Sequence, residues 1–141
     1  MKKRILSMAL MLVVWIGLLP AAGFAESGVA TVNGVEYATI DEAVAQWQQT
    51  NNSTLTLLAD VTLSDVVVLK STENHTLQLG VYTMTAADGK NAIQITSNGM
   101  PDRGERPALT IAADGTNPGG INAGSKACVY YKYDSNLAGN N

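Results

Sequence analysis

Three four-residue segments of the chain repeat one pattern of side chains. They begin at Thr54, Thr76 and Ala108, and each places a small residue before an apolar, a polar and a second apolar residue. Such alternation is typical of a β-strand with one buried face. The first two segments begin 22 residues apart and the last two begin 32 residues apart. A nearly constant interval with one insertion predicts a solenoid, in which successive turns of the chain stack on one another.

The alternative is an antiparallel β-sandwich acting as an interaction domain, because its strands also recur at short regular intervals. Sandwich strands follow one another through hairpin turns. The clear two-residue hairpin signal in this chain is Asn33-Gly34, which precedes the repeated segments. The segments between the expected strands are instead rich in Gly, Pro, Asn, Asp and Ser, which predict turns and loops. We therefore favour the solenoid. Parallel pairing of Thr54 with Thr76 would exclude the sandwich.

A short helix is expected between the hairpin and the first repeated segment. Thr39 and Glu42 have the spacing of a capping box. Four apolar residues then share one helical face, and a polar turn at 50–53 ends the helix; the four are Ile40, Ala43, Val44 and Trp47. The first turn of a solenoid needs a lid, because its free strand edge would otherwise recruit another chain. We expect this helix to be the lid, with Trp47 and Val44 facing the apolar interior.

The first 25 residues are typical of a secretory signal peptide. Three basic residues are followed by an uncharged apolar stretch over 5–19, then Pro20, and then a small residue at each cleavage-site position up to Ala25. The alternative, a membrane anchor, is less favoured because a spanning helix needs about 20 apolar residues. We predict a signal peptide over 1–25, the hairpin and capping helix over 26–53, and the stacked strands over 54–141. The protein is then secreted or at the cell surface, with no membrane span after cleavage.

Composition excludes several classes of function. The chain has 9 Lys and Arg against 12 Asp and Glu, and three of the basic residues lie in the expected signal peptide. This acidic balance argues against nucleic-acid binding. The single cysteine, Cys128, rules out a disulfide framework and a Cys-rich zinc site. We expect Cys128 to be a small buried apolar residue, although an odd cysteine in an exported chain can also be reactive.

No catalytic, cofactor-binding or metal-binding constellation is predicted. The only histidine, His75, follows a polar turn and is expected to be exposed there, rather than catalytic. Six aspartates fit turn positions, and two short Asp-Gly segments, at 88–91 and 114–117, lack the ligand spacing of an EF-hand. The six aspartates are Asp60, Asp65, Asp88, Asp102, Asp114 and Asp134.

A tyrosine cluster near the C-terminus is the one candidate binding feature. Tyr130, Tyr131 and Tyr133 lie in a strand-like run, where Tyr130 would face opposite to the other two. Exposed tyrosines can stack on sugars, so we consider carbohydrate contact possible at these three residues. An edge strand without a following turn of chain would show the same exposure.

Residues 32–85 resemble the opening of secreted bacterial right-handed parallel β-helix proteins of the pectin-lyase-like superfamily. The similarity includes the Val-Asn-Gly segment at 32–34, the Tyr-Ala-Thr-Ile-Asp-Glu-Ala segment at 37–43, and the strands at 54–62 and 76–84. One departure is Gly80-Val81, where the family usually has Asn-Gly one place later. The resemblance implies a mainly β fold, a short right-handed parallel β-helix of about three to four coils with an N-terminal hairpin and an amphipathic capping helix.

The same resemblance leaves activity open, because the fold hosts lyases, hydrolases, adhesins and inert surface proteins. Our first hypothesis is a non-catalytic β-solenoid module for adhesion, display, or binding of polysaccharide or a host or cell-wall surface. The alternative is the N-terminal fragment of a polysaccharide lyase or glycoside hydrolase. The residues after the tyrosine run contain no expected C-terminal cap. The solenoid is therefore expected to be incomplete, as a truncated frame or the first part of a longer protein.

Overall fold

The computed structural model describes residues 27–97 and 109–133, and these residues form a mainly β structure with one helix. The chain begins with a hairpin of β1 (Ala30–Val32) and β2 (Val35–Tyr37). Asn33 and Gly34 join them with φ values of 49° and 84°. Both residues are in the left-handed region, as a type I′ turn requires, which confirms the predicted hairpin.

The helix α2 (Ile40–Gln49) follows the hairpin. Thr39 is its N-cap, and the Thr39 hydroxyl accepts a hydrogen bond from the Glu42 backbone amide. The helix buries the predicted face through Ile40, Ala43 and Trp47, while Val44 is half-buried against the same core. The predicted capping helix is therefore confirmed in its bounds, its N-cap and its buried face.

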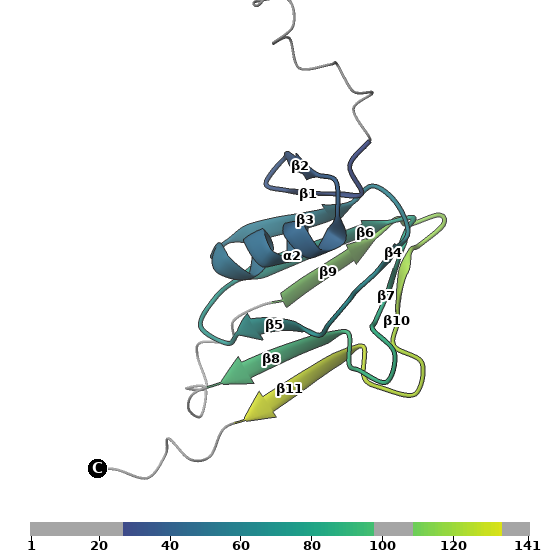
Figure 1. Ribbon diagram of the computed structural model, residues 1–141. Coiled ribbons are helices and arrows are strands. Elements are labelled where there is room, and N and C mark those ends of the chain that lie inside the picture. Colours follow the sequence, from purple (N-terminus) through teal and green to yellow (C-terminus); the bar gives the residue numbers. More distant parts are fainter. Residues whose placement is uncertain (1–26, 98–108, 134–141) are drawn as a thin grey trace, which may run out of the picture.

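Nine further strands form three parallel sheets, and the chain passes through the three sheets in the same order three times (Figure 1). Sheet A contains β3 (Ser53–Leu57), β6 (His75–Gly80) and β9 (Leu109–Ala113). Sheet B contains β4 (Val61–Thr62), β7 (Thr83–Thr85) and β10 (Gly120–Asn122). Sheet C contains β5 (Val67–Lys70), β8 (Ile93–Ser97) and β11 (Val129–Tyr133). Each passage through A, B and C is one layer, so β3, β4 and β5 form the first layer.

The register of sheet A confirms that the repeated segments stack. Thr54 pairs with Thr76 and Leu55 with Leu77, in parallel orientation. This pairing excludes the antiparallel sandwich. In the third layer Leu77 pairs with Ile111, so the structural repeat is 34 residues and not the 32 inferred from the sequence. A shift of two residues leaves the same side chains on the buried face, so alternation alone does not distinguish the two registers.

Sheet B was the least well predicted part of the fold. Residues 81–84 were expected to continue the strand that begins at Thr76, but the Tyr82 amide donates to the Leu79 oxygen in a turn that separates β6 from β7. Gly80, at φ 58°, supplies the left-handed conformation of this turn. Residues 117–120 were predicted as a turn, but the last of them, Gly120, begins β10. It forms a strand because Gly120 and Ile121 pair with Thr83 and Met84 of β7.

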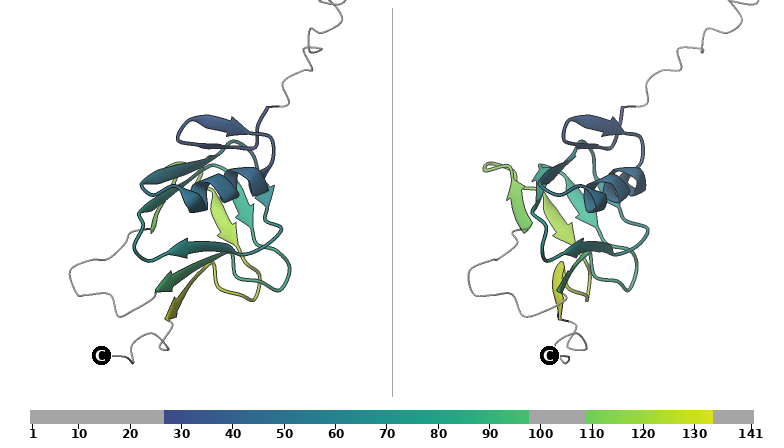
Figure 2. Two further views of the ribbon diagram at one scale, coloured as in Figure 1. Left: turned by 60° about the vertical axis from the view of Figure 1, so that its left-hand side comes forward. Right: turned by 90° about the vertical axis from the view of Figure 1, so that its left-hand side faces the viewer.

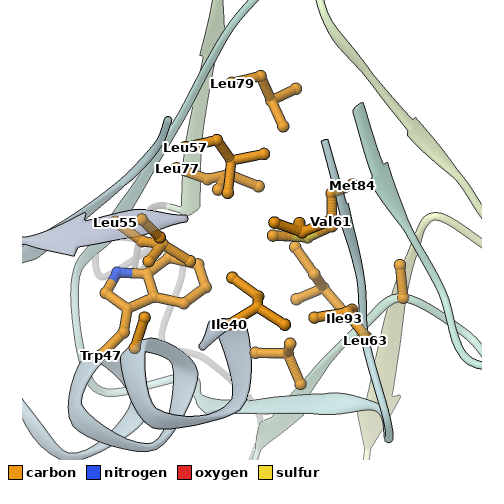
Figure 3. Packing of buried hydrophobic residues seen from close by; sticks show 14 of the residues in the cluster. Ile40, Trp47, Leu55, Leu57, Val61, Leu63, Leu77, Leu79, Met84 and Ile93 are labelled. Carbon is orange, nitrogen blue, oxygen red and sulfur yellow. The ribbon is translucent and has the colours of Figure 1, made fainter. Parts of the chain in front are cut away.

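The apolar core lies between the three sheets and beneath the helix (Figure 3). Leu55 and Leu77 of sheet A, Met84 of sheet B and Ile93 of sheet C all point into this space and are fully buried. Burial of each such side chain contributes about 1.5–3 kcal/mol. Trp47 closes the core from the helix side.

One end of the stack is covered by the N-terminal elements. β1 pairs antiparallel with the edge of β3 that faces away from β6. The Gln48 Nε2 donates to the backbone oxygen of Val68 in β5 over 3.0 Å, and Ser64 donates to the Asp41 carboxylate over 2.7 Å. The hairpin lies at this end, and β11 lies at the opposite end (Figure 2). We call the end formed by β9, β10 and β11 the outer end.

Candidate binding face and a buried polar array

The outward face of sheet C carries two rows of side chains that cross its three strands. Val68, Gln94 and Tyr130 are successive partners in the first row. Lys70, Thr96 and Lys132 form the second row. The Tyr130 side chain is 45% exposed, and Lys70 and Lys132 are also exposed. This surface, defined by these six residues, is called the sheet C face below.

The structure places Tyr130 and Tyr131 on opposite faces of β11. Tyr131 pairs with Ile95 and shares the inward side of Ile93, yet it is 45% exposed. It is exposed because β11 is the last strand of sheet C among the described residues. The backbone of Tyr133 pairs with Ser97. The three tyrosines therefore do not form one platform, and Tyr130 is the one that the sheet C face presents.

His75 lies in the core, and its predicted exposure is wrong. It is the first residue of β6, and its side chain points inward in alternation with Leu77 and Leu79. Its Nδ1 lies 3.2 Å from the Ser53 hydroxyl, and its Nε2 lies 3.4 Å from a Glu73 carboxylate oxygen. The imidazole also packs edge-on against Trp47, with ring centroids 5.4 Å apart. Counting the alternation back from Leu77 would have predicted this burial.

The Ser53, His75 and Glu73 side chains form a buried polar array, but the contacts of Ser53 are structural. The Ser53 hydroxyl also contacts the backbone oxygens of Trp47 and Thr50, at the end of helix α2. A hydroxyl held in this way is not presented to a substrate. The adjacent cavity has a volume of about 10 Å³, enough for about one water molecule. A hydrogen bond from Lys70 is the main reason that the pKa of Glu73 lies below its usual range.

A larger hollow lies at the corner between sheets B and C, with a volume of about 390 Å³. Thr62, Thr85 and Asn122 are stacked partners along one side of it. Asp88 and Lys126 lie at its rim and are exposed. The hollow is open, with both polar and apolar lining, and local sequence patterns do not indicate it because its residues come from three different layers.

Most of the aspartates have the turn role that was expected. Asp60 accepts a hydrogen bond from the Thr83 amide over 2.7 Å, and Asp114 accepts from two amides of its own turn. These amides lower the pKa of Asp114. Asp65 accepts from Lys90 over 2.7 Å, which lowers the pKa of Asp65. Asp102 and Asp134 lie outside the described residues. Within 27–97 and 109–133, no three His, Cys, Asp or Glu side chains come together as a metal site.

Cys128 was expected to be buried, and the structure shows that it is exposed. It lies in the outermost layer, just before β11, where no described residue packs over it. Its thiol donates a hydrogen bond to the backbone oxygen of Ile121 over 3.2 Å.

Comparisons with protein-family models, curated proteins and solved structures found no match to the chain. No helix within the described residues is long and apolar enough to cross a membrane.

Proposed function

We propose that the three sheets form a short right-handed parallel β-helix of three coils, capped at its first coil by the hairpin and α2. The cyclic order of the strands supports this, because the chain visits sheets A, B and C in turn and each strand pairs with its counterpart in the next layer. The handedness is supported by a general rule. Connections between parallel strands of one sheet are right-handed in nearly all known cases.

This β-helix is a secreted or cell-surface module of the pectin-lyase-like type, and its role is to bind or display and not to catalyse. Export is supported by the signal-like sequence of residues 1–25. The non-catalytic role is supported by the buried polar array. There, the Ser53 hydroxyl donates to the backbone oxygen of Trp47 near the end of α2, and His75 contacts both Ser53 and the Trp47 ring.

The ligand of the module is a polysaccharide, bound on the sheet C face. The exposure of Tyr130 beside cationic Lys132 and polar Gln94 carries this proposal. A tyrosine ring offers an apolar face together with a hydroxyl, so it suits the mixed apolar and polar surface of a sugar. Lys132 and Lys70 favour a polymer that carries carboxylates, because a charge-assisted hydrogen bond is stronger than a neutral one.

Binding to a panel of immobilised neutral and uronic-acid polysaccharides tests the proposal. Tyr130→Ala should weaken binding at least several-fold, whereas Tyr130→Phe should retain most of it. Val35→Ala is the matched control, since Val35 is also exposed but lies in the hairpin at the other end. Equal binding by all four proteins would contradict a role for the sheet C face.

A turnover assay tests the non-catalytic part. The purified protein is incubated with pectin and other polyuronates, and absorbance of unsaturated chain ends is followed. We expect no increase above the buffer control. A steady increase would instead support the lyase alternative.

A further inference from the structure

We infer that the outer edge of β11 pairs antiparallel with the same edge of a second copy of this chain, forming a two-fold symmetric dimer. The backbone groups of β11 point alternately toward β8 and toward the outer edge. The Ile93 amide of β8 donates to the Cys128 oxygen over 3.0 Å. Because backbone groups alternate in direction along a strand, those of Tyr130 and Lys132 also point toward β8. Those of Val129 and Tyr131 point toward the outer edge, where no described strand pairs with them.

The inward side chains of the outer end are exposed as well. Val129 of sheet C and Ile111 of sheet A stand in the positions of buried second-layer residues, and Tyr131 in that of half-buried Ile95, yet the three are 40%, 42% and 45% exposed. The corresponding second-layer residues Ile93 and Leu77 are fully buried. Unpaired edge groups beside exposed apolar side chains make this end a template for strand pairing.

The sequence of β11 is complementary to itself when the strand is rotated by 180° about Tyr131. Tyr131 then lies opposite Tyr131 of the second copy, and each can donate its amide to the other's backbone oxygen. This is the hydrogen-bonded pair of an antiparallel ladder, and it uses the groups that point outward. Tyr130 lies opposite Lys132 of the second copy, on the sheet C face. Such a pair brings an ammonium group to an aromatic ring, which is a favourable contact.

The same two-fold symmetry also determines how sheets A and B of the two copies meet. A two-fold axis perpendicular to sheet C, at the outer edge of β11 beside Tyr131, brings sheet A of one copy over sheet B of the other. Ile111 of β9 is then covered by the region of β10 in the second copy. A contact of this kind uses the same surface on both partners, so the assembly is complete with two copies. It does not continue into a fibre, because the opposite end of each chain is covered by β1 and α2.

The oligomeric state of the purified protein tests the inference. Light scattering after size-exclusion chromatography, over a wide range of concentration, should give the mass of a dimer that dissociates on dilution. Tyr131→Asp places two carboxylates opposite each other and should raise the dissociation constant at least about tenfold. Tyr131→Phe should remain dimeric. Val35→Asp, at the covered end, is the matched control and should also remain dimeric. Circular dichroism should show that all three variants are folded.

The single cysteine gives an independent measure of the register. Cys128 is exposed and lies three residues from the proposed two-fold axis, so the two Cys128 Cα atoms should be about 20 Å apart. Nitroxide labels on Cys128 should report this separation, extended by the length of the labels, in pulsed electron resonance. A wild-type monomer at every concentration, continued growth beyond two copies, a dimer insensitive to Tyr131→Asp, or a much longer label distance would each overturn the inference.

Discussion

The indole nitrogen of Trp47 donates a hydrogen bond to the backbone oxygen of Ser53 over 3.2 Å, and the Ser53 hydroxyl contacts the backbone oxygen of Trp47. These two reciprocal contacts join the capping helix to the first strand of sheet A. Both residues are buried, so neither contact is exchanged with water. The position of the helix over the first layer is therefore set by polar contacts as well as by apolar packing.

Trp47→Ala should lower the free energy of unfolding by about 3–5 kcal/mol, because it removes the largest fully buried side chain and leaves a cavity. Urea denaturation followed by circular dichroism measures this change. Gln49→Ala, on the exposed face of the same helix, should change stability by less than about 0.5 kcal/mol. Comparable losses for the two variants would mean that the helix does not pack on the core as described.

Ser53→Ala should cost about 1–3 kcal/mol, because the buried partners of the hydroxyl lose their hydrogen bond. These partners include the Trp47 oxygen and the His75 Nδ1. Ser64→Ala is the matched control: Ser64 also makes a side-chain hydrogen bond, to Asp41, but it is exposed. Its cost should be at most about 0.5 kcal/mol. Thermal or urea unfolding of the two serine variants distinguishes the buried contact from the exposed one.

Local signals in the sequence predicted the N-terminal half of the fold. The hairpin was predicted from Asn33-Gly34, and the helix from Thr39 and the apolar face that follows it. The stacking of Leu55 on Leu77 was predicted from the repeated segments. Each of these depends on residues close in sequence, or on an interval without insertions. The predicted export, polysaccharide binding and pectin-lyase-like kinship stay predictions.

The features that were missed depend on residues distant in sequence. β10 begins at Gly120, directly after Gly119, and becomes a strand only because β7 lies beside it. The alternation of β6 indicates that His75 is buried, but its hydrogen-bond partner Ser53 lies in the preceding layer. The exposure of Cys128 depends on its position in the outermost layer. The sheet C face likewise combines three strands, so only the tyrosines of β11 could be recognised from the sequence.

Acid should weaken the contribution of the Lys70–Glu73 contact to the stability of the folded protein. Lys70 donates to Glu73 over 3.0 Å, and this is the main reason that the pKa of Glu73 is lowered in the folded protein. A lowered folded-state pKa stabilises the protein at pH values above the unfolded-state pKa of about 4.3. That contribution is lost as the pH falls through the lower folded-state pKa. Lys70→Met should therefore be less stable than wild type near neutrality, and the difference should shrink below about pH 4.

Urea denaturation at a series of pH values measures this difference. Lys126→Met, in an exposed turn, is the control for loss of a lysine charge and should show a smaller pH-dependent difference. Added salt should also reduce the effect of Lys70→Met, because exposed charges are screened. A difference that grows in acid would show that the contact has been assigned the wrong sign.

Gly119→Ala should disrupt the pairing of the third layer with the second. A Cβ atom at Gly119 would overlap the backbone oxygen of Tyr82 and lie 2.7 Å from the Tyr82 amide nitrogen. Both contacts are with backbone, so a side-chain rotation does not relieve them. The Gly119 amide also donates to the Gly80 oxygen over 2.9 Å, which fixes the close approach of these two turns. The cost should be at least about 1–3 kcal/mol, the range for overpacking.

The neighbouring glycine provides the control for Gly119→Ala. A Cβ at Gly120 meets no atom within 4 Å, although Gly120 also belongs to the pairing of β10 with β7. Gly120→Ala should therefore leave the urea midpoint nearly unchanged. Hydrogen exchange localises the effect, because the Gly120 amide donates to the Tyr82 oxygen over 3.2 Å. This amide should lose protection in Gly119→Ala, while amides of the first layer keep theirs. Equal loss of stability in both variants would mean that the strand, and not the close approach at Tyr82, requires glycine.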